Sequence, residues 1–222
     1  MKVLELIAPS QFVVSEKPKP SPGNGEVLIK VSFCGICGSD VHGMDNSSGR
    51  RIPPMVMGHE ASGVIAELGE GVEGWAVEDR VSFDSMVFCG ECDFCERGET
   101  NLCDERQVMG VSCDEFKRDG AFAEWVIVPA RILERIPEGL SFEEAAFTEP
   151  LAVALHAVNL VKVNPGESAL VVGSGLIGLL VIQALKRAGC GEIIAVDLDR
   201  GRLELAMKLV ATSAFHSLED EI

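Results

Sequence analysis

Two groups of cysteines carry side chains that can bind a metal ion. The first group starts with Cys34 and Cys37 and continues with Asp40, His42 and the pair His59-Glu60. A soft thiolate, an imidazole and a carboxylate in one pocket form a ligand set that suits Zn²⁺. We therefore predict a catalytic zinc site in this part of the chain.

The pair Cys34 and Cys37 has a competing interpretation. A C-x-x-C element can be a redox dithiol, in which a helix N-terminus activates one cysteine, usually beside a βαβ unit. No βαβ pattern surrounds this pair, and further metal-binding side chains follow it closely. This context favours metal binding over redox chemistry. His59 taken alone would instead be interpreted as a hydrogen-bonded structural histidine.

The second group of cysteines has a more specific spacing. Cys89, Cys92, Cys95 and Cys103 follow the pattern C-x2-C-x2-C-x7-C. Four thiolates spaced in this way can enclose one tetrahedral ion, with Zn–S bonds of about 2.3 Å. Because a closed shell of four sulfurs leaves no position for a substrate, we predict a structural zinc ion that stabilises residues 89–103. An iron-sulfur cluster and a pair of disulfides are the alternatives.

The composition excludes several functional classes. The 222 residues include 35 acidic and 19 basic side chains, and the formal net charge of -16 repels phosphate backbones and anionic membranes. With 47% hydrophobic residues, the chain is expected to be globular. No stretch is long enough to span a bilayer, and Lys2 and Glu5 interrupt the apolar start that a secretory signal needs.

These features predict a cytoplasmic protein without nucleic-acid or membrane partners. The chain has eight cysteines, an even number that would also permit disulfides. In a reducing cytosol, clustered cysteines serve more often as metal ligands or catalytic groups.

Short strands must position the first metal group. Residues 26–31 are rich in β-branched and apolar side chains and come just before the first cysteine pair, so we predict a strand that carries the cysteine loop. Residues 61–68, 79–83 and 121–128 show further strand patterns. Short strands at this spacing are typical of a small barrel or sandwich.

A helical pattern follows these strands. Ser141 is a candidate N-cap with Glu144 three residues later, and the pattern runs to Ala146. We expect Pro150 to interrupt it and residues 151–161 to continue at helical spacing into a second domain. His156 lies in this apolar run and is expected to pack against other side chains.

A glycine pattern typical of dinucleotide binding opens the second domain. Gly173, Gly175 and Gly178 follow a buried strand at residues 168–172 and precede a helical pattern. The first glycine permits a tight turn, the second lets the backbone approach a pyrophosphate, and the third lets the helix pack on the strand. The helix N-terminus, with Leu176 and Ile177 between the glycines, would face the phosphates.

The acid at the end of the next strand predicts the choice of cofactor. Residues 192–197 form an apolar strand that ends in Asp197, where a carboxylate can accept hydrogen bonds from the adenosine ribose hydroxyls. A 2′-phosphate would meet Asp197 as a like charge, so we predict NAD rather than NADP. Arg200 and Arg202 are close enough to bind a phosphate if Asp197 points away. The alternative for Asp197 is a cap of the turn.

With its two metal sites in this order, the sequence resembles the zinc-dependent medium-chain alcohol dehydrogenases. Within that superfamily it is most similar to the branch of the sorbitol, or polyol, and butanediol dehydrogenases. The resemblance implies a GroES-like, β-barrel-type catalytic domain followed by a Rossmann doubly wound parallel sheet, a fold of mixed α/β and β class. It rests on Cys37, Ser39, Asp40, His42, the triplet Gly58-His59-Glu60, the four-cysteine segment and Glu149-Pro150-Leu151.

The resemblance also implies a ligand set. Alcohol dehydrogenases are the usual example of a Cys₂His catalytic zinc site. Residues 147–153 hold a glutamate where those enzymes have their second cysteine. In the polyol branch the ligands would be Cys37, His59 and Glu60, with Glu149 binding the metal directly or through its water. The expected content is two zinc ions per chain.

The reaction implied by the resemblance is NAD-linked oxidation of a secondary alcohol or polyol to the ketone. The metal lowers the pKa of the bound alcohol, Ser39 accepts the proton, and His42 passes it toward solvent. Asp40 would orient a metal ligand. L-Threonine and formaldehyde dehydrogenase activities are alternatives within the same family.

Glu78 departs from the family, which usually has glycine before the aspartate of this turn. If the turn needs a positive φ angle, a glutamate there costs about 1 kcal/mol.

The sequence holds only the first half of a doubly wound fold. After a helical pattern at residues 200–209, the remaining residues suffice for at most one more strand. We expect a catalytic domain at residues 1–150 and a partial NAD-binding domain at residues 151–222, in a chain truncated at its C-terminus. The resemblance implies a full-length homodimer or homotetramer. The alternative is a zinc- and nucleotide-binding fragment without turnover.

Overall fold

The computed structural model of the chain describes residues 1–112 and 117–220. It divides into two compact units, Met1–Glu149 and Pro150–Ile222. None of the helices in the described residues has the length and apolar character needed to cross a bilayer.

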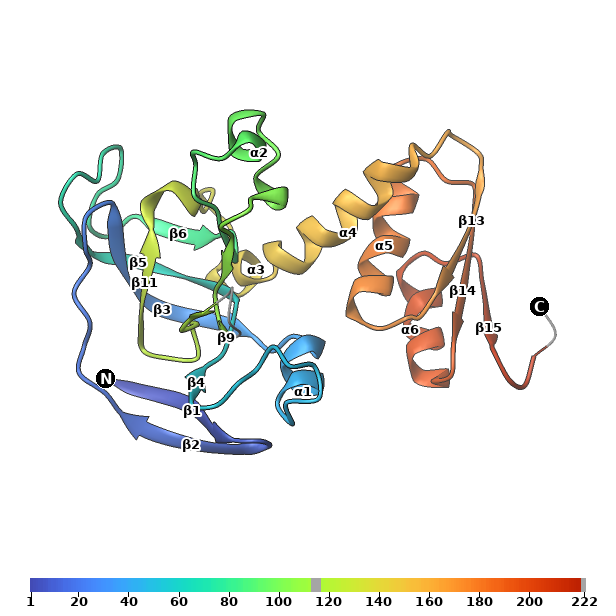
Figure 1. Cartoon of the computed structure of the whole chain (residues 1–222). Helices are drawn as coiled ribbons and strands as arrows, with labels where there is room; N and C mark the ends of the chain where they lie inside the picture. Colours follow the sequence, from blue (N-terminus) through green and yellow to red (C-terminus); the bar gives the residue numbers. More distant parts are fainter. Residues whose placement is uncertain (113–116, 221–222) are drawn as a thin grey trace. The chain divides into compact units, whose positions relative to one another are not determined.

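An antiparallel five-stranded sheet forms the body of the first unit (Figure 1). Val27, Ile29 and Ile65 are fully buried in the core on one side of it. Burying each such side chain stabilises the fold by about 1.5–3 kcal/mol relative to leaving it exposed. The order is β11 (Trp125–Pro129), β3 (Glu26–Gly35), β5 (Glu60–Leu68), β6 (Arg80–Phe83) and β12 (Leu133–Arg135).

The described residues of this unit form three further, smaller sheets. They contain β2 (Gln11–Glu16), β1 (Lys2–Ala8) and β4 (Met55–Val56); β7 (Met86–Val87) and β8 (Gln107–Val108); and β9 (Val111–Ser112) and β10 (Lys117–Arg118). The predicted strands at residues 26–31, 61–68 and 79–83 are confirmed, whereas the strand predicted at 121–128 covers Trp125–Pro129. The mixed fold class is confirmed. In the described residues, however, the sheets stay separate and do not close into one barrel.

Two helices join end to end after the strands. Ser141 caps α3 (Phe142–Ala146): its Oγ accepts from the Glu144 backbone N–H at 3.2 Å, and the Glu144 carboxylate accepts from the Ser141 N–H at 2.8 Å. The predicted N-cap is therefore confirmed. The predicted interruption at Pro150 is wrong, because α4 (Thr148–Val161) starts before it. Proline is tolerated in a first helical turn, where its missing N–H has no intrahelical partner.

The prediction that His156 packs into a core is also wrong. Its side chain is exposed on α4, and the buried positions of that helix are Pro150, Ala154 and Val158. A histidine within an apolar run can thus lie on the outer face of a helix, because the face depends on the helical phase.

The turn before β6 contains a glutamate in the left-handed region. Glu78 has a φ of 71°, its backbone N–H donates to the Ile65 carbonyl at 2.8 Å, and its side chain is exposed. The backbone strain anticipated at this position is present. We expect Glu78→Gly to raise the free energy of unfolding by about 1 kcal/mol, since only the Cβ penalty is removed.

Urea denaturation checks this prediction. Glu73→Gly is the matched control, because Glu73 is an exposed glutamate of the same loop that is absent from the positive-φ residues. This control is expected to lose stability through the added freedom of the unfolded chain. Equal losses in both variants would show that the φ angle of Glu78 carries no strain.

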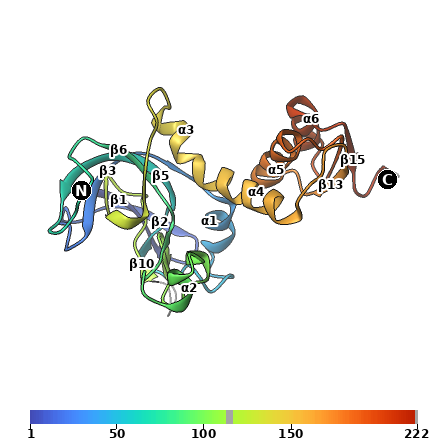
Figure 2. The same ribbon diagram turned by 90° about the horizontal axis from the view of Figure 1, so that it is seen from above.

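In its described residues, the second unit has a three-stranded parallel sheet with α5 (Leu176–Arg187) and α6 (Arg200–Leu209) on one face (Figures 1 and 2). Its core buries Ile182, Ile193 and Leu203. Most of α4 also belongs to this unit, and its Val158 joins the core. The strands predicted at 168–172 and 192–197, the helix at 200–209 and one further strand are confirmed. The three strands are β13 (Ser168–Val172), β14 (Glu192–Asp197) and β15 (Ser213–His216).

Candidate metal centres

The end of one strand and the start of its neighbour build the first metal group. β3 ends at Gly35, Cys37 is the N-cap of α1 (Gly38–Gly43), and β5 begins with Glu60. Because Gly35 pairs with Glu60 across the sheet, the cysteine loop returns beside His59 and Glu60. One ligand atom each from Cys37, His59 and Glu60 lies within 4.8 Å of the others. The structure thus brings together three predicted ligands that are distant in sequence.

Two glycines make this close approach possible. Gly58 precedes the histidine with a φ of 97°, a conformation that L-residues with a Cβ rarely adopt. At Gly35, a Cβ would overlap the carboxylate of Glu60. These two glycines therefore let the backbone bring the side chains of His59 and Glu60 close to Cys37.

Buried polar atoms without partners indicate that this space fits a cation. Within the described residues, His59 Nδ1 and Glu60 Oε1 have no hydrogen-bond partner although both are buried. An unpaired buried polar atom costs about 1–3 kcal/mol. A divalent ion among a thiolate, an imidazole and a carboxylate would give Glu60 Oε1 a partner, whereas His59 Nδ1 lies 3.6 Å from Asp40 Oδ1. The donor set therefore fits Zn²⁺.

The electrostatics of the group agree with this reading. Burial raises the pKa of Glu60 above its usual range. Burial opposes protonation of His59, but the hydrogen bond with Cys37 and the charge of Asp40 outweigh it and raise its pKa. Burial also raises the pKa of the neighbouring Cys34 thiol to about 12. Cys34 does not belong to the group of close ligand atoms.

Asp40 connects the metal group to a buried arginine. One of its carboxylate oxygens accepts from the Cys37 backbone N–H at 3.1 Å. The other lies 3.6 Å from His59 Nδ1 and 3.4 Å from Arg51 Nη2. Asp40 is itself buried, so it faces the histidine from behind, as expected for a residue that orients a ligand.

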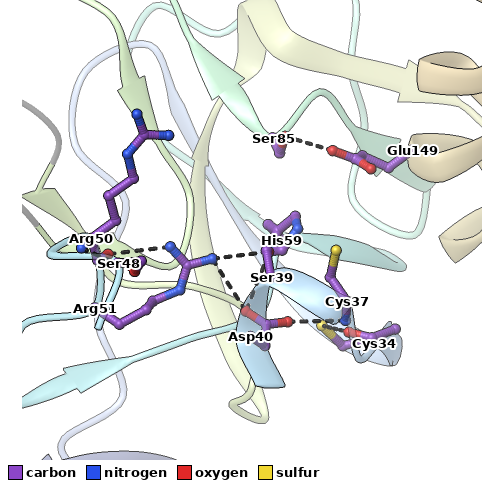
Figure 3. Close-up of polar contacts among 11 residues, drawn as sticks. Cys34, Cys37, Ser39, Asp40, Ser48, Arg50, Arg51, His59, Ser85 and Glu149 are labelled. Atoms are coloured by element: carbon purple, nitrogen blue, oxygen red, sulfur yellow. Dashed lines mark hydrogen bonds and ion pairs between the residues drawn. The ribbon is translucent and has the colours of Figure 1, made fainter. Parts of the chain in front are cut away.

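A cavity of about 420 Å³ lies beside the metal group, and Ser39, His42, His59 and Glu149 line it. Glu149 accepts a hydrogen bond from Ser85 Oγ at 3.1 Å and is not among the close ligand atoms (Figure 3). Ser39, His42 and Glu149 thus share one cavity, and their catalytic roles stay a prediction.

Two residues of this site were missed by sequence reasoning. Ser85 comes just after β6, where a small polar residue following an apolar strand was a usable signal. Arg51 belongs to the pair Arg50-Arg51 in a polar loop and carried no signal, because a charged pair in a loop is usually solvated.

The four-cysteine segment also gathers its ligands. One sulfur from each of Cys89, Cys92, Cys95 and Cys103 lies within 4.8 Å of the others. The Sγ of Cys89 lies 3.9 Å from that of Cys95 and 3.6 Å from that of Cys103. Four sulfurs at tetrahedral positions around one zinc ion lie about 3.8 Å apart. All four thiols are free, which is contrary to the alternative of a pair of disulfides.

Two of the four cysteines lie at helix ends of this segment. Cys92 is the N-cap of α2 (Asp93–Glu96), and Cys103 follows η1 (Thr100–Leu102). Hydrogen bonds from the backbone of Cys95 and Asp104 lower the pKa of Cys92 to about 6, whereas loss of hydration raises the pKa of Cys95 to about 12. In Figure 2 the segment projects from the body of its unit. Among residues 89–103, Cys103 is the one fully buried side chain.

In the second unit, the glycine turn has the geometry of a phosphate loop. Gly173 has a φ of 94°, Gly175 is the N-cap of α5, and at Gly178 a Cβ would overlap the Gly173 carbonyl. Leu176 and Ile177 open α5 with exposed side chains. The turn role of Gly173 and the packing role of Gly178 thus have a structural counterpart, whereas the approach of Gly175 to a pyrophosphate stays a prediction.

Asp197 closes this loop. Its carboxylate accepts from the backbone N–H of Ser174 at 2.6 Å and of Asp199 at 2.9 Å. Arg202 Nη1 lies 4.0 Å away. Arg200 instead pairs with Glu219 at 2.8 Å and Asp220 at 2.9 Å, away from Asp197.

Comparison with known proteins identifies the family. The description "Alcohol dehydrogenase GroES-like domain" matches residues 23–138, which is more than half of the chain. The chain belongs to the alcohol dehydrogenase GroES-like domain family. The resemblance to zinc-dependent medium-chain dehydrogenases is thereby confirmed.

Individual family members extend over both units. Sorbitol dehydrogenase from Halalkalibacterium halodurans is 40% identical over 214 residues, 95% of this chain and 60% of that protein. The structure of 2R,3R-butanediol dehydrogenase from Bacillus subtilis has a TM-score of 0.86 and 34% identity, covering 100% of this chain and 64% of that chain.

The structure of a short chain alcohol dehydrogenase from E. coli CFT073, complexed with the cofactor NADH, has a TM-score of 0.90 and 35% identity. The match covers 99% of this chain and 63% of that chain. The chain therefore spans about three-fifths of the length of these alcohol dehydrogenase relatives.

Proposed function

We propose that the protein is a zinc-dependent, NAD-linked dehydrogenase that oxidises a secondary alcohol or polyol to the ketone. The observation that carries this proposal is the close approach of Cys37, His59 and Glu60, in which a buried oxygen of Glu60 has no partner among the described residues and His59 lines a cavity. Three protein ligands next to a cavity are typical of catalytic zinc, which keeps one position for substrate. Sorbitol and butanediol dehydrogenases among the relatives support the substrate class.

Each residue of this group has a distinct part. Zinc held by Cys37, His59 and Glu60 would supply a Lewis acid that makes an alcohol hydroxyl acidic near neutral pH. Ser39 would accept the hydroxyl proton, and His42, exposed on α1, would deliver it to solvent.

Supporting residues hold this group in place. Asp40 would hold His59 in orientation from behind. We propose that Glu149 acts through water, because its carboxylate is bonded to Ser85 and lies outside the close ligand atoms.

The second zinc would be structural. Cys89, Cys92, Cys95 and Cys103 form a closed sulfur shell whose spacing fits a tetrahedral ion. Such an ion orders a segment that has little core of its own.

The cofactor in this proposal is NAD. Gly173, Gly175 and Gly178 with Leu176 and Ile177 would bind the pyrophosphate at the α5 N-terminus. Asp197 would accept the ribose hydroxyls. Arg200 is engaged by Glu219 and Asp220, so only Arg202 is available near Asp197 for a 2′-phosphate.

Asp197→Asn tests the cofactor assignment. Removing the charge should let Arg202 meet a 2′-phosphate, so the ratio of kcat/KM for NAD over NADP is expected to fall at least about tenfold, equivalent to about 1.4 kcal/mol. Glu204→Gln, an exposed acid of α6, is the charge-matched control and should leave the ratio unchanged. A ratio that stays constant in Asp197→Asn would remove Asp197 from the cofactor site.

The wider assignments follow the family. We propose a cytoplasmic enzyme that assembles as a homodimer or homotetramer, without nucleic-acid or membrane partners. L-Threonine or formaldehyde dehydrogenase activity is the alternative substrate choice. A zinc- and nucleotide-binding polypeptide without turnover is the alternative for the chain of residues 1–222.

Zinc analysis and a substrate panel test the function. The zinc-loaded complete gene product should contain two zinc ions per chain and form NADH with butanediol or sorbitol faster than with threonine or formaldehyde. Titration of the 222-residue chain with NADH, followed by fluorescence, tests the alternative for that chain. Absence of any cofactor binding at millimolar NADH would leave only the metal-binding role.

A further inference from the structure

Two arginines, Arg50 and Arg51, line one side of the cavity beside the metal group, next to His42, and we call this side the cationic wall. Glu149 is the one carboxylate among the described lining residues. Figure 3 shows both arginines on one side of His59 and Glu149 on the other. The proposed zinc ligands and cofactor loop make no use of Arg50 or Arg51.

Packing fixes the position of Arg51. Its side chain is only 6% exposed, and its stem lies against Gly43, where a Cβ would come within 2.7 Å of Arg51 Cγ. Nη2 donates to Ser39 Oγ at 3.2 Å and Nη1 donates to the Arg50 carbonyl at 3.2 Å. Because this guanidinium is ordered in advance, binding a ligand there costs little side-chain entropy.

The charge of Arg51 is only partly neutralised. Asp40 Oδ1 lies 3.4 Å from Nη2, longer than the range of about 2.7–2.9 Å for charged N–H···O bonds. The Asp40 carboxylate also accepts a hydrogen bond from the Cys37 N–H and lies near His59 Nδ1. Within residues 1–112 and 117–220, the Nε of Arg51 has no partner.

Arg50 adds a second charge. Its side chain is exposed, and among the described residues it has no hydrogen-bond or ion-pair partner. The cationic wall therefore presents more positive than negative charge to the cavity.

We propose that the cationic wall binds an anionic group of the substrate, so that the alcohol oxidised carries a phosphate or a carboxylate. This inference rests on the proposed function, which puts the reacting hydroxyl at Cys37 and His59. Guanidinium groups present paired donors that match the oxygens of both anions. A cavity of about 420 Å³ falls within the usual range for small-molecule sites and has room for a hydroxyl and a charged end.

The anion bound by the cationic wall could also belong to the cofactor, because the dinucleotide carries a diphosphate. The two sources differ in what the arginines control. If the substrate supplies the anion, the arginines determine the ratio of kcat/KM for charged over neutral alcohols. If the cofactor supplies it, they set the affinity for NAD and leave that ratio unchanged.

Titration with inorganic phosphate tests the binding group without turnover. The zinc-loaded protein is titrated by calorimetry, and the Kd for phosphate is expected to rise at least about tenfold in Arg51→Met and about threefold or more in Arg50→Gln. Arg187→Gln, which removes an exposed arginine of α5, is the control and should bind as the original protein does. Unchanged binding in Arg50→Gln and Arg51→Met, or equal loss in the control, would overturn the proposal.

Steady-state kinetics then separate the two sources. With the complete gene product, kcat/KM for a polyol phosphate or a hydroxy acid should fall at least about tenfold in Arg50→Gln, whereas that for the neutral polyol should change less than about threefold. A raised Kd for NAD with a constant ratio of kcat/KM for charged over neutral alcohols would assign the anion to the cofactor and overturn the substrate class.

Two further results keep the proposal testable if Arg51→Met does not fold or if the protein shows no turnover. Arg50→Gln alters an exposed side chain, so it reports on the wall even if Arg51→Met fails to fold. Absence of turnover with every alcohol would refute the proposed function, yet the phosphate titration would still decide whether the cationic wall binds anions.

Discussion

Cys103→Ser is expected to lower the free energy of unfolding by at least about 3 kcal/mol and the zinc content from two ions to one. Structural zinc supplies about 10–16 kcal/mol of apparent binding free energy in zinc-finger peptides at neutral pH, and a serine hydroxyl is a far weaker ligand than a thiolate. Cys103 is fully buried, and residues 89–103 offer no other fully buried side chain to hold them. Elemental analysis and thermal unfolding measure both effects.

Cys190→Ser separates loss of metal from loss of a buried thiol. Cys190 is buried in the second unit and lies in neither metal group. This variant should keep two zinc ions, whatever it costs in packing. Retention of both ions in Cys103→Ser would exclude the four-sulfur site.

Cys37→Ser is expected to leave the fold in place and abolish turnover. Its thiolate is one of three close ligand atoms, so the zinc content should again fall from two ions to one. The activity of the complete gene product should fall at least about 1000-fold, because the acidity of the alcohol depends on the ion. The midpoint of thermal unfolding should move far less than in Cys103→Ser. Cys37 lies between β3 and α1, and the five-stranded sheet that contains β3 has a hydrophobic core of its own.

Cys34→Ser is the matched control for this variant. Cys34 lies at the end of β3, shortly before Cys37, and is not among the close ligand atoms. The variant should therefore keep two zinc ions and most of its activity. Equal unfolding of Cys37→Ser and Cys103→Ser would contradict the division into catalytic and structural ions.

Local patterns were enough to predict the second unit and the four-cysteine segment. β13, β14 and α6 appear at the predicted residues, because a short apolar run between turn residues admits few other structures. The four cysteines lie close along the chain, so their spacing alone indicated that one ion could bind them. The glycine turn was predictable for the same reason.

Tertiary contacts decided what the sequence could not predict. The proximity of Arg51 to Asp40 depends on how the loop before β4 folds over α1, and no local pattern encodes it. The bond between Ser85 and Glu149 joins residues 64 positions apart. The start of α4 before Pro150 and the outward face of His156 depend on helical phase, to which short patterns are insensitive.

The high pKa of Cys34 has a practical consequence for thiol labelling. A maleimide or iodoacetamide reacts with thiolates, so Cys34 and the buried Cys190 should stay unlabelled in the folded chain. The five thiols of the two metal groups would be masked while the ions are bound and would become reactive after chelation. Peptide mass spectrometry of alkylated protein would then report the occupancy of each metal site separately.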